Sequence, residues 1–231
     1  MTFLYLLIDL AALSVPLVFS FHPKIALYKK WPAMWCAILL STIPFIIWDS
    51  HFTQIGVWGF NETYLLGAYF LHLPVEEILF FICIPYSCLF TYFCFRIYLG
   101  ADFRLKNENI ITWIILLITI GLGICFYDRL YTFYTAVGLT LFLLFIKFVV
   151  KAKWLGLFFY SHMYLLLPFF IVNGILTGTG LEKPIVWYNN AENMGFRLLS
   201  IPFEDVFYGM LMLLLNTFLF EFFMKKFGDN S

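Results

Sequence analysis

The sequence predicts an all-α fold, a polytopic membrane protein with seven transmembrane helices. Of the 231 residues, 63% are hydrophobic and 12% are charged, whereas soluble domains are about 45–50% apolar and about 25% charged. The apolar residues form solid blocks, of which 110–126 is the clearest. Transmembrane β-barrels need short alternating strands instead, so the blocks favour helices.

Seven blocks approach or exceed the roughly 20 residues that a helix needs to cross hydrocarbon. They cover residues 2–21, 33–48, 74–99, 110–126, 130–150, 155–176 and 202–224. The first block carries Asp9 and has neither a basic leader nor a small-x-small cleavage site, so we expect a permanent helix and not a removable signal peptide. Seven spans leave no room for a separate soluble domain.

The basic residues predict the orientation. If the first span runs from outside to inside, 11 of the 14 Lys and Arg residues fall on the inner side, as the positive-inside rule requires. They are Lys24, Lys29, Lys30, Arg96, Arg104, Lys106, Lys147, Lys151, Lys153, Lys225 and Lys226, against Arg129, Lys183 and Arg197 outside. We expect a cell inner-membrane protein with its N-terminus outside and its C-terminus in the cytoplasm.

The second and sixth blocks begin two similar stretches of chain. Pro44 and Pro168 lie within these blocks, and loops of 25 residues, 49–73 and 177–201, follow them. Each loop leads into a P-x-acid-acid-x-x-aromatic string, at 74–80 and at 202–208. A chain of this composition is expected to contain about 0.03 P-x-acid-acid strings by chance, so two in register indicate an internal repeat.

The predicted organisation is a single membrane domain, 1–231, arranged as 3+1+3 helices. Repeat one covers 1–100, a linking helix 101–128 and repeat two 129–231. Because the single linking helix restores the direction of the chain, the two repeats are expected to run parallel about an axis along the membrane normal. Both acid pairs then lie on the outer side.

The two acid pairs, Glu76 with Glu77 and Glu204 with Asp205, are the candidate catalytic residues. Ionisable groups within spans cost about 3 to more than 10 kcal/mol at the bilayer centre and mostly face a cavity or the bundle interior. An acid in a first helical turn also complements the helix dipole, by roughly 0.3–1 kcal/mol. Because adjacent helix residues point about 100° apart, one acid of each pair can serve the helix end while its neighbour faces inward.

Aromatic and polar residues accompany both pairs. Rings follow at three or four residues, on the same helix face as the acids, and aromatic faces stabilise cations. Asp49 follows Pro44 by five residues, as Asn173 follows Pro168. The candidate substrate-binding residues are Phe80, Phe81, Phe207, Tyr208, Asp49 and Asn173.

Other polar residues in the spans receive simpler interpretations. Asp9 and Asn216 are expected to make interhelical hydrogen bonds, and Glu221 at most an exposed ion pair with Lys225, four residues later. His72 has no cluster of ligands around it, so no metal site is expected. The net charge of zero gives no indication of a nucleic-acid partner.

Taken together, these motifs resemble the small integral-membrane lycopene cyclases, which occur as two-subunit bacterial enzymes and as fused archaeal or fungal domains. The resemblance covers nearly the whole chain. It rests on Pro-Val-Glu-Glu at 74–77 before Phe80 and Phe81, Pro-Phe-Glu-Asp at 202–205 before Phe207, Tyr208 and Gly209, Trp48-Asp49, and Gly-Val-Trp-Gly-Phe at 56–60. Val172-Asn173, where the first half has Trp48-Asp49, departs from the pattern.

The resemblance implies a lycopene cyclase that converts linear end groups of lycopene to β-rings, giving γ-carotene or β-carotene in carotenoid biosynthesis. An acid protonates the terminal double bond, the cation closes a six-membered ring and a base removes a proton. Because substrate and product are isomers, no cofactor is expected, and the chain lacks a G-x-G-x-x-G turn. The chain resembles a fusion of both subunits, so no separate cyclase subunit is expected. The expected partners are the carotenoid substrate and membrane lipid.

One alternative comes from another class of protein. A 3+1+3 plan is also that of SWEET-type small-solute transporters, although their Pro-Gln signature is absent, since Gln54 is the only glutamine. A retinal-binding receptor is disfavoured because 202–224 contains no lysine for a Schiff base. Di-iron hydroxylases need more histidines than the four present.

Overall fold

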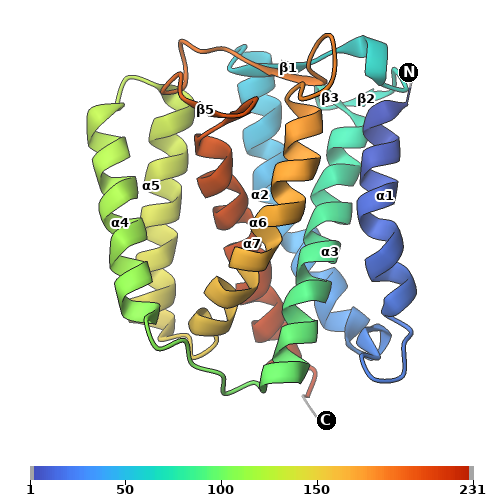
Figure 1. Cartoon of the computed structure of the whole chain (residues 1–231), viewed down its shortest axis with the longest axis vertical. Coiled ribbons are helices and arrows are strands. Elements are labelled where there is room, and N and C mark those ends of the chain that lie inside the picture. The colour runs from blue at the N-terminus through green and yellow to red at the C-terminus, as the bar shows by residue number, and fades with distance from the viewer. Residues whose placement is uncertain (1–2, 229–231) are drawn as a thin grey trace.

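The computed structural model describes residues 3–228, and within them the chain forms a bundle of seven α-helices (Figure 1). The first residue of the predicted span 2–21, and residues 1–2 and 229–231 of the predicted domain, lie outside the described part. The helices are α1 Leu4–Phe19, α2 Trp31–Gln54, α3 Val75–Leu99, α4 Glu108–Cys125, α5 Leu130–Leu144, α6 Leu155–Leu176 and α7 Glu204–Lys226. A 3-10 turn, Leu27–Lys30, precedes α2, and α5 continues as a π-helical turn, Phe145–Val150.

Six of these helices, α2 to α7, are long and apolar enough to cross a membrane, which indicates a membrane-integral protein. The predicted helical class is therefore confirmed. The first helix is shorter than predicted: α1 has 16 residues, or about 24 Å at 1.5 Å per residue. Its predicted end at residue 21 is wrong, because the chain turns away from the helix after Phe19.

The loops 49–73 and 177–201 contain short strands that the sequence analysis did not predict. The central pair is β1 Trp58–Phe60 with β4 Val186–Tyr188, antiparallel, with Gly59 opposite Trp187. A side chain at Gly59 would collide with the Trp187 ring. Two hairpins flank this pair, β2 Tyr69–Phe70 with β3 Leu73–Pro74 and β5 Arg197–Leu198 with β6 Ile201–Pro202. A 3-10 turn, Glu62–Tyr64, lies between β1 and β2.

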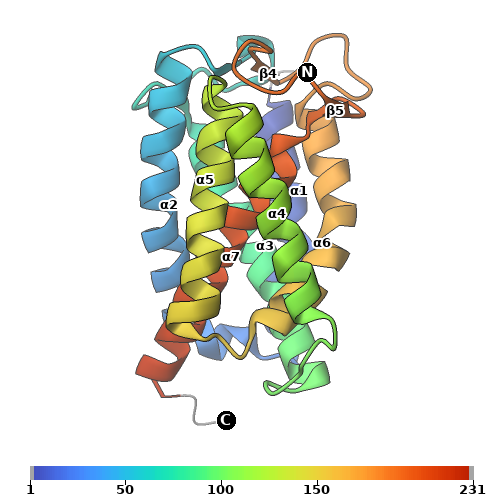
Figure 2. The same cartoon turned by 90° about the vertical axis from the view of Figure 1, so that its left-hand side faces the viewer.

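All three strand pairs lie at one end of the bundle, and we call this the strand end (Figures 1 and 2). The described chain begins at the strand end and finishes at the opposite end. The loops that join α1 to α2, α3 to α4 and α5 to α6 also lie at the opposite end. These loops and the helix ends beside them carry the 11 basic residues assigned to the inner side, with Arg96 in the last turn of α3 and Lys147 in the π-helical turn.

The helices pack in an interleaved order. α2 lies against α7 and α3 against α6 and α7, so helices from the first three and the last three pack on each other, while α4 packs on α5. Ser41 of α2 donates a 2.7 Å hydrogen bond to Asn216 Oδ1 of α7. The predicted interhelical bond of Asn216 is confirmed. Asp9 is fully buried, but neither of its carboxyl oxygens has a hydrogen-bond partner, so its predicted bond is wrong.

Glu221 differs from its prediction. Its side chain is buried and turns toward α3, where it accepts a 2.7 Å hydrogen bond from Tyr92 and lies 3.2 Å from Arg96 Nε. The prediction of an exposed ion pair with Lys225 considered only neighbours of Glu221 on the same helix. The packing of α3 on α7 supplies closer partners, and the resulting ion pair joins the two helices far from the strand end.

Candidate active site

A cavity of about 270 Å³ opens between α1, α3, α6 and α7 and reaches the strand end of the bundle. Its lining is mainly apolar. On α3 it extends from Glu77 to Thr91, and 14 residues of helix correspond to roughly 21 Å. Ala12 and Pro16 of α1 and Leu166 of α6 line it and are partly exposed. The cavity is therefore a long apolar chamber that reaches the outer surface of the bundle between α1 and α6.

One acid of each predicted pair, Glu77 of α3 and Asp205 of α7, lines the strand end of this chamber. Both lie in the first turn of their helix and are at least nine-tenths buried. The chamber also contains Asp49 from the last part of α2. Three carboxyl groups from three helices therefore converge on one apolar space.

Glu77 and Asp49 are two buried carboxyls that line the same end of the chamber. Tyr5 of α1 donates its hydroxyl to Glu77, and Trp58 of β1 donates its indole N–H to Asp49. No donor among the described residues reaches Asp49 Oδ2. An ionised carboxylate only accepts hydrogen bonds, so this buried oxygen has no partner there that would stabilise a negative charge on it.

Asp205 is surrounded by donors instead. Tyr131 of α5 donates to Oδ1 at 2.5 Å, Tyr188 of β4 to Oδ2 at 3.0 Å, and the Asn173 amide of α6 also to Oδ2 at 3.4 Å. Three donors to one carboxyl stabilise its ionised form. Burial and the charge of Asp205 in turn raise the pKa of Tyr188 well above 10.0, so Tyr188 stays a donor.

The other acid of each pair lies outside the chamber lining. Glu76 Oε1 accepts the backbone N–H of Leu66 at 2.5 Å, and Glu204 Oε1 accepts the backbone N–H of Met194 at 2.7 Å. In both cases the donor lies ten residues earlier, in the loop above the helix. Glu204 also accepts the Thr132 hydroxyl. These two carboxyls hold the loops on the helix ends.

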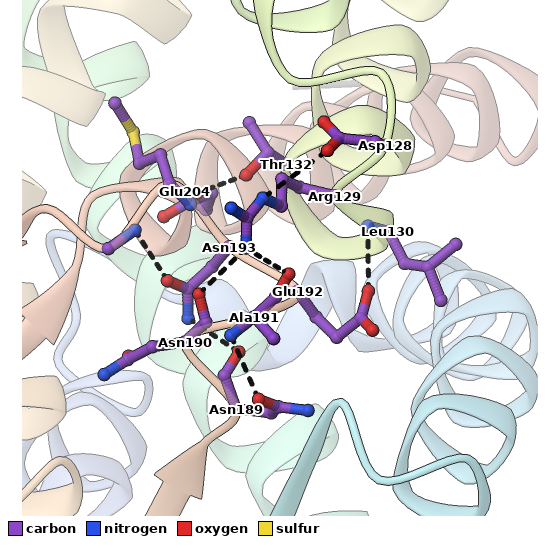
Figure 3. Close-up of polar contacts among 12 residues, drawn as sticks. Asp128, Arg129, Leu130, Thr132, Asn189, Asn190, Ala191, Glu192, Asn193 and Glu204 are labelled. Atoms are coloured by element: carbon purple, nitrogen blue, oxygen red, sulfur yellow. Dashed lines mark hydrogen bonds and ion pairs between the residues drawn. The ribbon is translucent and has the colours of Figure 1, made fainter.

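The loop above Glu204 is fixed on the start of α5 (Figure 3). Glu192 accepts the backbone N–H groups of Leu130, through its carboxyl at 3.3 Å, and of Tyr131, through its carbonyl at 2.9 Å. Arg129 donates to the carbonyl of Ala191 at 2.5 Å. These bonds satisfy free N–H groups at a helix start and hold Tyr131 in place above Asp205.

Four aromatic side chains line the strand end of the chamber between the carboxyls: Trp58, Tyr131, Tyr188 and Tyr208. We call them the aromatic box. Trp58 lies 5.1 Å from Tyr131, 6.1 Å from Tyr188 and 6.3 Å from Tyr208, measured between ring centroids. Tyr131 and Tyr188 stack at 5.7 Å. The pairing of β1 with β4 places Trp58 opposite Tyr188, so the box depends on contact between the two loops.

Comparison with known proteins identifies the family. A family model described as lycopene cyclase matches residues 2–95 and 128–223. The chain belongs to the lycopene cyclase family. It is also 28% identical over 108 residues to a bifunctional lycopene cyclase/phytoene synthase of Aspergillus oryzae, a match that spans 43% of this chain and 18% of that relative. No solved structure matches, and nothing in these comparisons supports a small-solute transporter.

In this lycopene cyclase family member, the predicted site residues divide into two groups. Glu77, Phe80, Tyr208, Asp49, Asn173 and Asp205 line the chamber. Phe81 and Phe207 are buried but lie outside its lining, like Glu76 and Glu204. The division follows helix geometry, because neighbouring residues point about 100° apart. Within residues 3–228, no group of three or more His, Cys, Asp or Glu side chains is placed to hold a metal ion.

Sequence reasoning missed four residues that line the strand end of the chamber: Tyr5, Trp58, Tyr131 and Tyr188. One signal for them was present. Tyr5 precedes Glu77 by 72 residues and Tyr131 precedes Asp205 by 74, so a tyrosine lies at a similar, though not identical, distance before the acid string in each repeat. Tyr188 carried no comparable signal, because its position depends on the pairing of two loops far apart in the chain.

Proposed function

We propose that the protein is a lycopene cyclase that closes the linear end groups of lycopene into β-rings by proton transfer. The single observation that carries this proposal is the chamber itself, an apolar space with carboxyl groups on both sides of an aromatic box. Such a site suits a hydrocarbon that gains a proton, becomes a cation and loses a proton. Substrate and product are isomers, so the reaction needs no electron donor or acceptor.

The pair Glu77 and Asp49 is the proton donor in this proposal. Two buried carboxyls that line the same apolar space disfavour joint ionisation, because burial and the charge of the neighbour both oppose it, so one of them keeps a proton. The hydrogen bond from Tyr5 orients Glu77, and that from Trp58 orients Asp49. Glu77 transfers the proton to the terminal double bond, and the electron pair of that bond forms the new C–H bond.

The aromatic box stabilises the cation that results. Its ring faces carry negative charge density, which is worth about 2 kcal/mol or more for a desolvated cation. The next double bond of the substrate attacks the cation and closes the six-membered ring, so the positive charge moves to a ring carbon. Phe80 provides a further ring wall along the chamber.

Asp205 is the base. Its three donors favour the ionised form before the substrate binds, and it removes a ring proton so that the electron pair of the C–H bond forms the ring double bond. The roles of Glu76 and Glu204 are structural in this proposal, since each binds the loop that covers its helix.

The internal repeat also belongs to this proposal. Supporting it, the Leu66–Glu76 and Met194–Glu204 bonds correspond, and so do the Tyr5–Glu77 and Tyr131–Asp205 bonds. We infer parallel repeats joined by α4, which need no separate cyclase subunit. With the 11 basic residues in the cytoplasm, the strand end and the site lie on the outer side of the inner membrane.

Expression in lycopene-accumulating cells tests the function. Pigment extracts should contain cyclic carotenes with β-rings, whereas cells with the Glu77→Gln/Asp205→Asn variant should keep their lycopene. The Glu76→Gln variant serves as the matched control, because it alters an adjacent carboxyl that does not line the chamber. Unchanged lycopene in cells with well-folded wild-type protein would reject the proposed activity.

A further inference from the structure

Two related grooves are expected from the two repeats, but the side chains at corresponding positions of the grooves differ in size. Alignment of the P-x-acid-acid strings places Gly209 of α7 on Phe81 of α3. Alignment of Asn173 with Asp49 places Val172 of α6 on Trp48 of α2. At both positions repeat one carries a large ring and repeat two a small residue.

The small residues lie in the chamber. Val172 and Gly209 both line it, together with Ala12 of α1. A side chain on Gly209 would meet the Phe169 ring at 3.6 Å, an ordinary contact distance. The space between α6 and the pair α3 and α7 therefore remains open where these residues face it.

The large residues, Trp48 of α2 and Phe81 of α3, fill the related groove between α2, α3, α5 and α7. The Trp48 ring lies 6.1 Å from Phe45 and 5.3 Å from Tyr208, and the Phe81 ring lies 6.1 Å from Phe45. Phe45 and Tyr208 are themselves 5.3 Å apart. The four rings form a continuous cluster, and neither Trp48 nor Phe81 lines the chamber.

The helix opposite this cluster is also closely packed. Gly138 of α5 occupies the position that Ala12 has in α1, seven residues after Tyr131 as Ala12 is seven after Tyr5. A β-carbon on Gly138 would lie 3.0 Å from Leu211 and 4.0 Å from Trp48. There is no room beside α5 comparable to the space that Ala12 faces.

We propose that the chain has a single end-group site, to which both repeats contribute a carboxyl, and that Trp48 and Phe81 close the second groove. This inference rests on the proposed function. It has a direct kinetic consequence: one end of the carotenoid reacts in each binding event. A second ring requires the monocyclic carotene to leave the chamber and to return with its other end first.

The first test fills the open groove. Val172→Trp introduces the ring that closes the related groove, and Ile171→Trp is the matched control, because it adds the same ring at an exposed neighbour outside the chamber lining. We expect Val172→Trp to cyclise lycopene at least roughly tenfold more slowly, equivalent to a loss of about 1.4 kcal/mol, and Ile171→Trp to stay near wild type. Wild-type rates in folded Val172→Trp would overturn the inference.

The second test counts binding sites, with lycopene itself as the probe. Purified Glu77→Gln protein in lipid nanodiscs should bind one lycopene per chain at saturation, and addition of Val172→Trp should abolish this binding. Two lycopenes per chain would overturn the single site and leave the proposed function standing. No saturable binding at all would reject the proposed function itself.

The third test follows the intermediate. Labelled lycopene is supplied in liposomes together with unlabelled monocyclic carotene. If each ring forms in a separate binding event, the added carotene dilutes the label in the bicyclic product. Bicyclic product that keeps the full label, with no exchange, would show that both ends react without release and would contradict the inference.

Discussion

Replacing Glu77 by glutamine should remove the proton donor while leaving the shape of the chamber unchanged. Glutamine has nearly the size of glutamate and still accepts the hydrogen bond from Tyr5, but it cannot transfer a proton. Loss of a general acid slows a reaction by about 10²–10⁴-fold, or roughly 2.7–5.4 kcal/mol of activation free energy. We expect a decrease of this size in the cyclisation rate.

Glu76→Gln is the matched comparison, because it makes the same chemical change one residue away. Glu76 lies outside the chamber lining and accepts the Leu66 N–H at 2.5 Å. A neutral acceptor in place of a charged one costs at most about 1 kcal/mol of unfolding free energy, so turnover should stay near wild type.

The assay measures cyclic carotene formed from lycopene in proteoliposomes by pigment chromatography, at equal amounts of folded protein. Thermal unfolding in detergent provides the stability comparison. If Glu77→Gln retained the wild-type rate and Glu76→Gln lost it, the assignment of the two carboxyls would be reversed and the argument from the chamber lining would fail.

Further changes test other parts of the structure. Tyr131→Phe removes one donor from Asp205 at a cost of about 1.5–3 kcal/mol, so cyclisation should slow roughly 10- to 150-fold; an unchanged rate would contradict the role of this bond. Glu221→Gln should lower the unfolding free energy by about 2 kcal/mol, less than for a fully buried pair because the Arg96 side chain is 16% exposed, with little effect on the rate of the folded protein; equal melting temperatures would contradict it. Tyr188 has a pKa raised well above 10.0, so its bond to Asp205 should be complete below pH 10 and lost only as the pH rises through the higher folded-state value. Comparison of tyrosinate absorbance in wild type and Tyr188→Phe checks this, and a titration step below pH 10 that disappears in the variant would refute it.

The helices could be predicted from the sequence because membrane spans follow from composition and length alone. The block 155–176 coincides with α6, and 74–99 differs from α3 by one residue. The second span was placed too short: α2 extends to Gln54, since polar residues at a helix end continue the backbone hydrogen bonds beyond the apolar block.

The site could be predicted only in part. The repeated acid strings pointed to four carboxyls, and the geometry of adjacent helix residues indicated that each pair would divide its work. Which acid faces the chamber depends on the rotation of α3 and α7 about their axes, and this is fixed by neighbouring helices. Trp58 belongs to the 56–60 motif, but its place opposite Tyr188 depends on a loop-to-loop pairing that no local pattern reveals.

The antiparallel pairing of β1 with β4 also has a consequence for the route by which the proposed substrate reaches the chamber. It ties together two loops that contact the carboxyls, since Trp58 of β1 donates to Asp49 and Tyr188 of β4 donates to Asp205. In the proposed reaction, the carotenoid would then enter and leave sideways, from the lipid, through the partly exposed flank between α1 and α6. The paired loops would also keep bulk water from the proposed carbocation, which a single water molecule would convert to an alcohol.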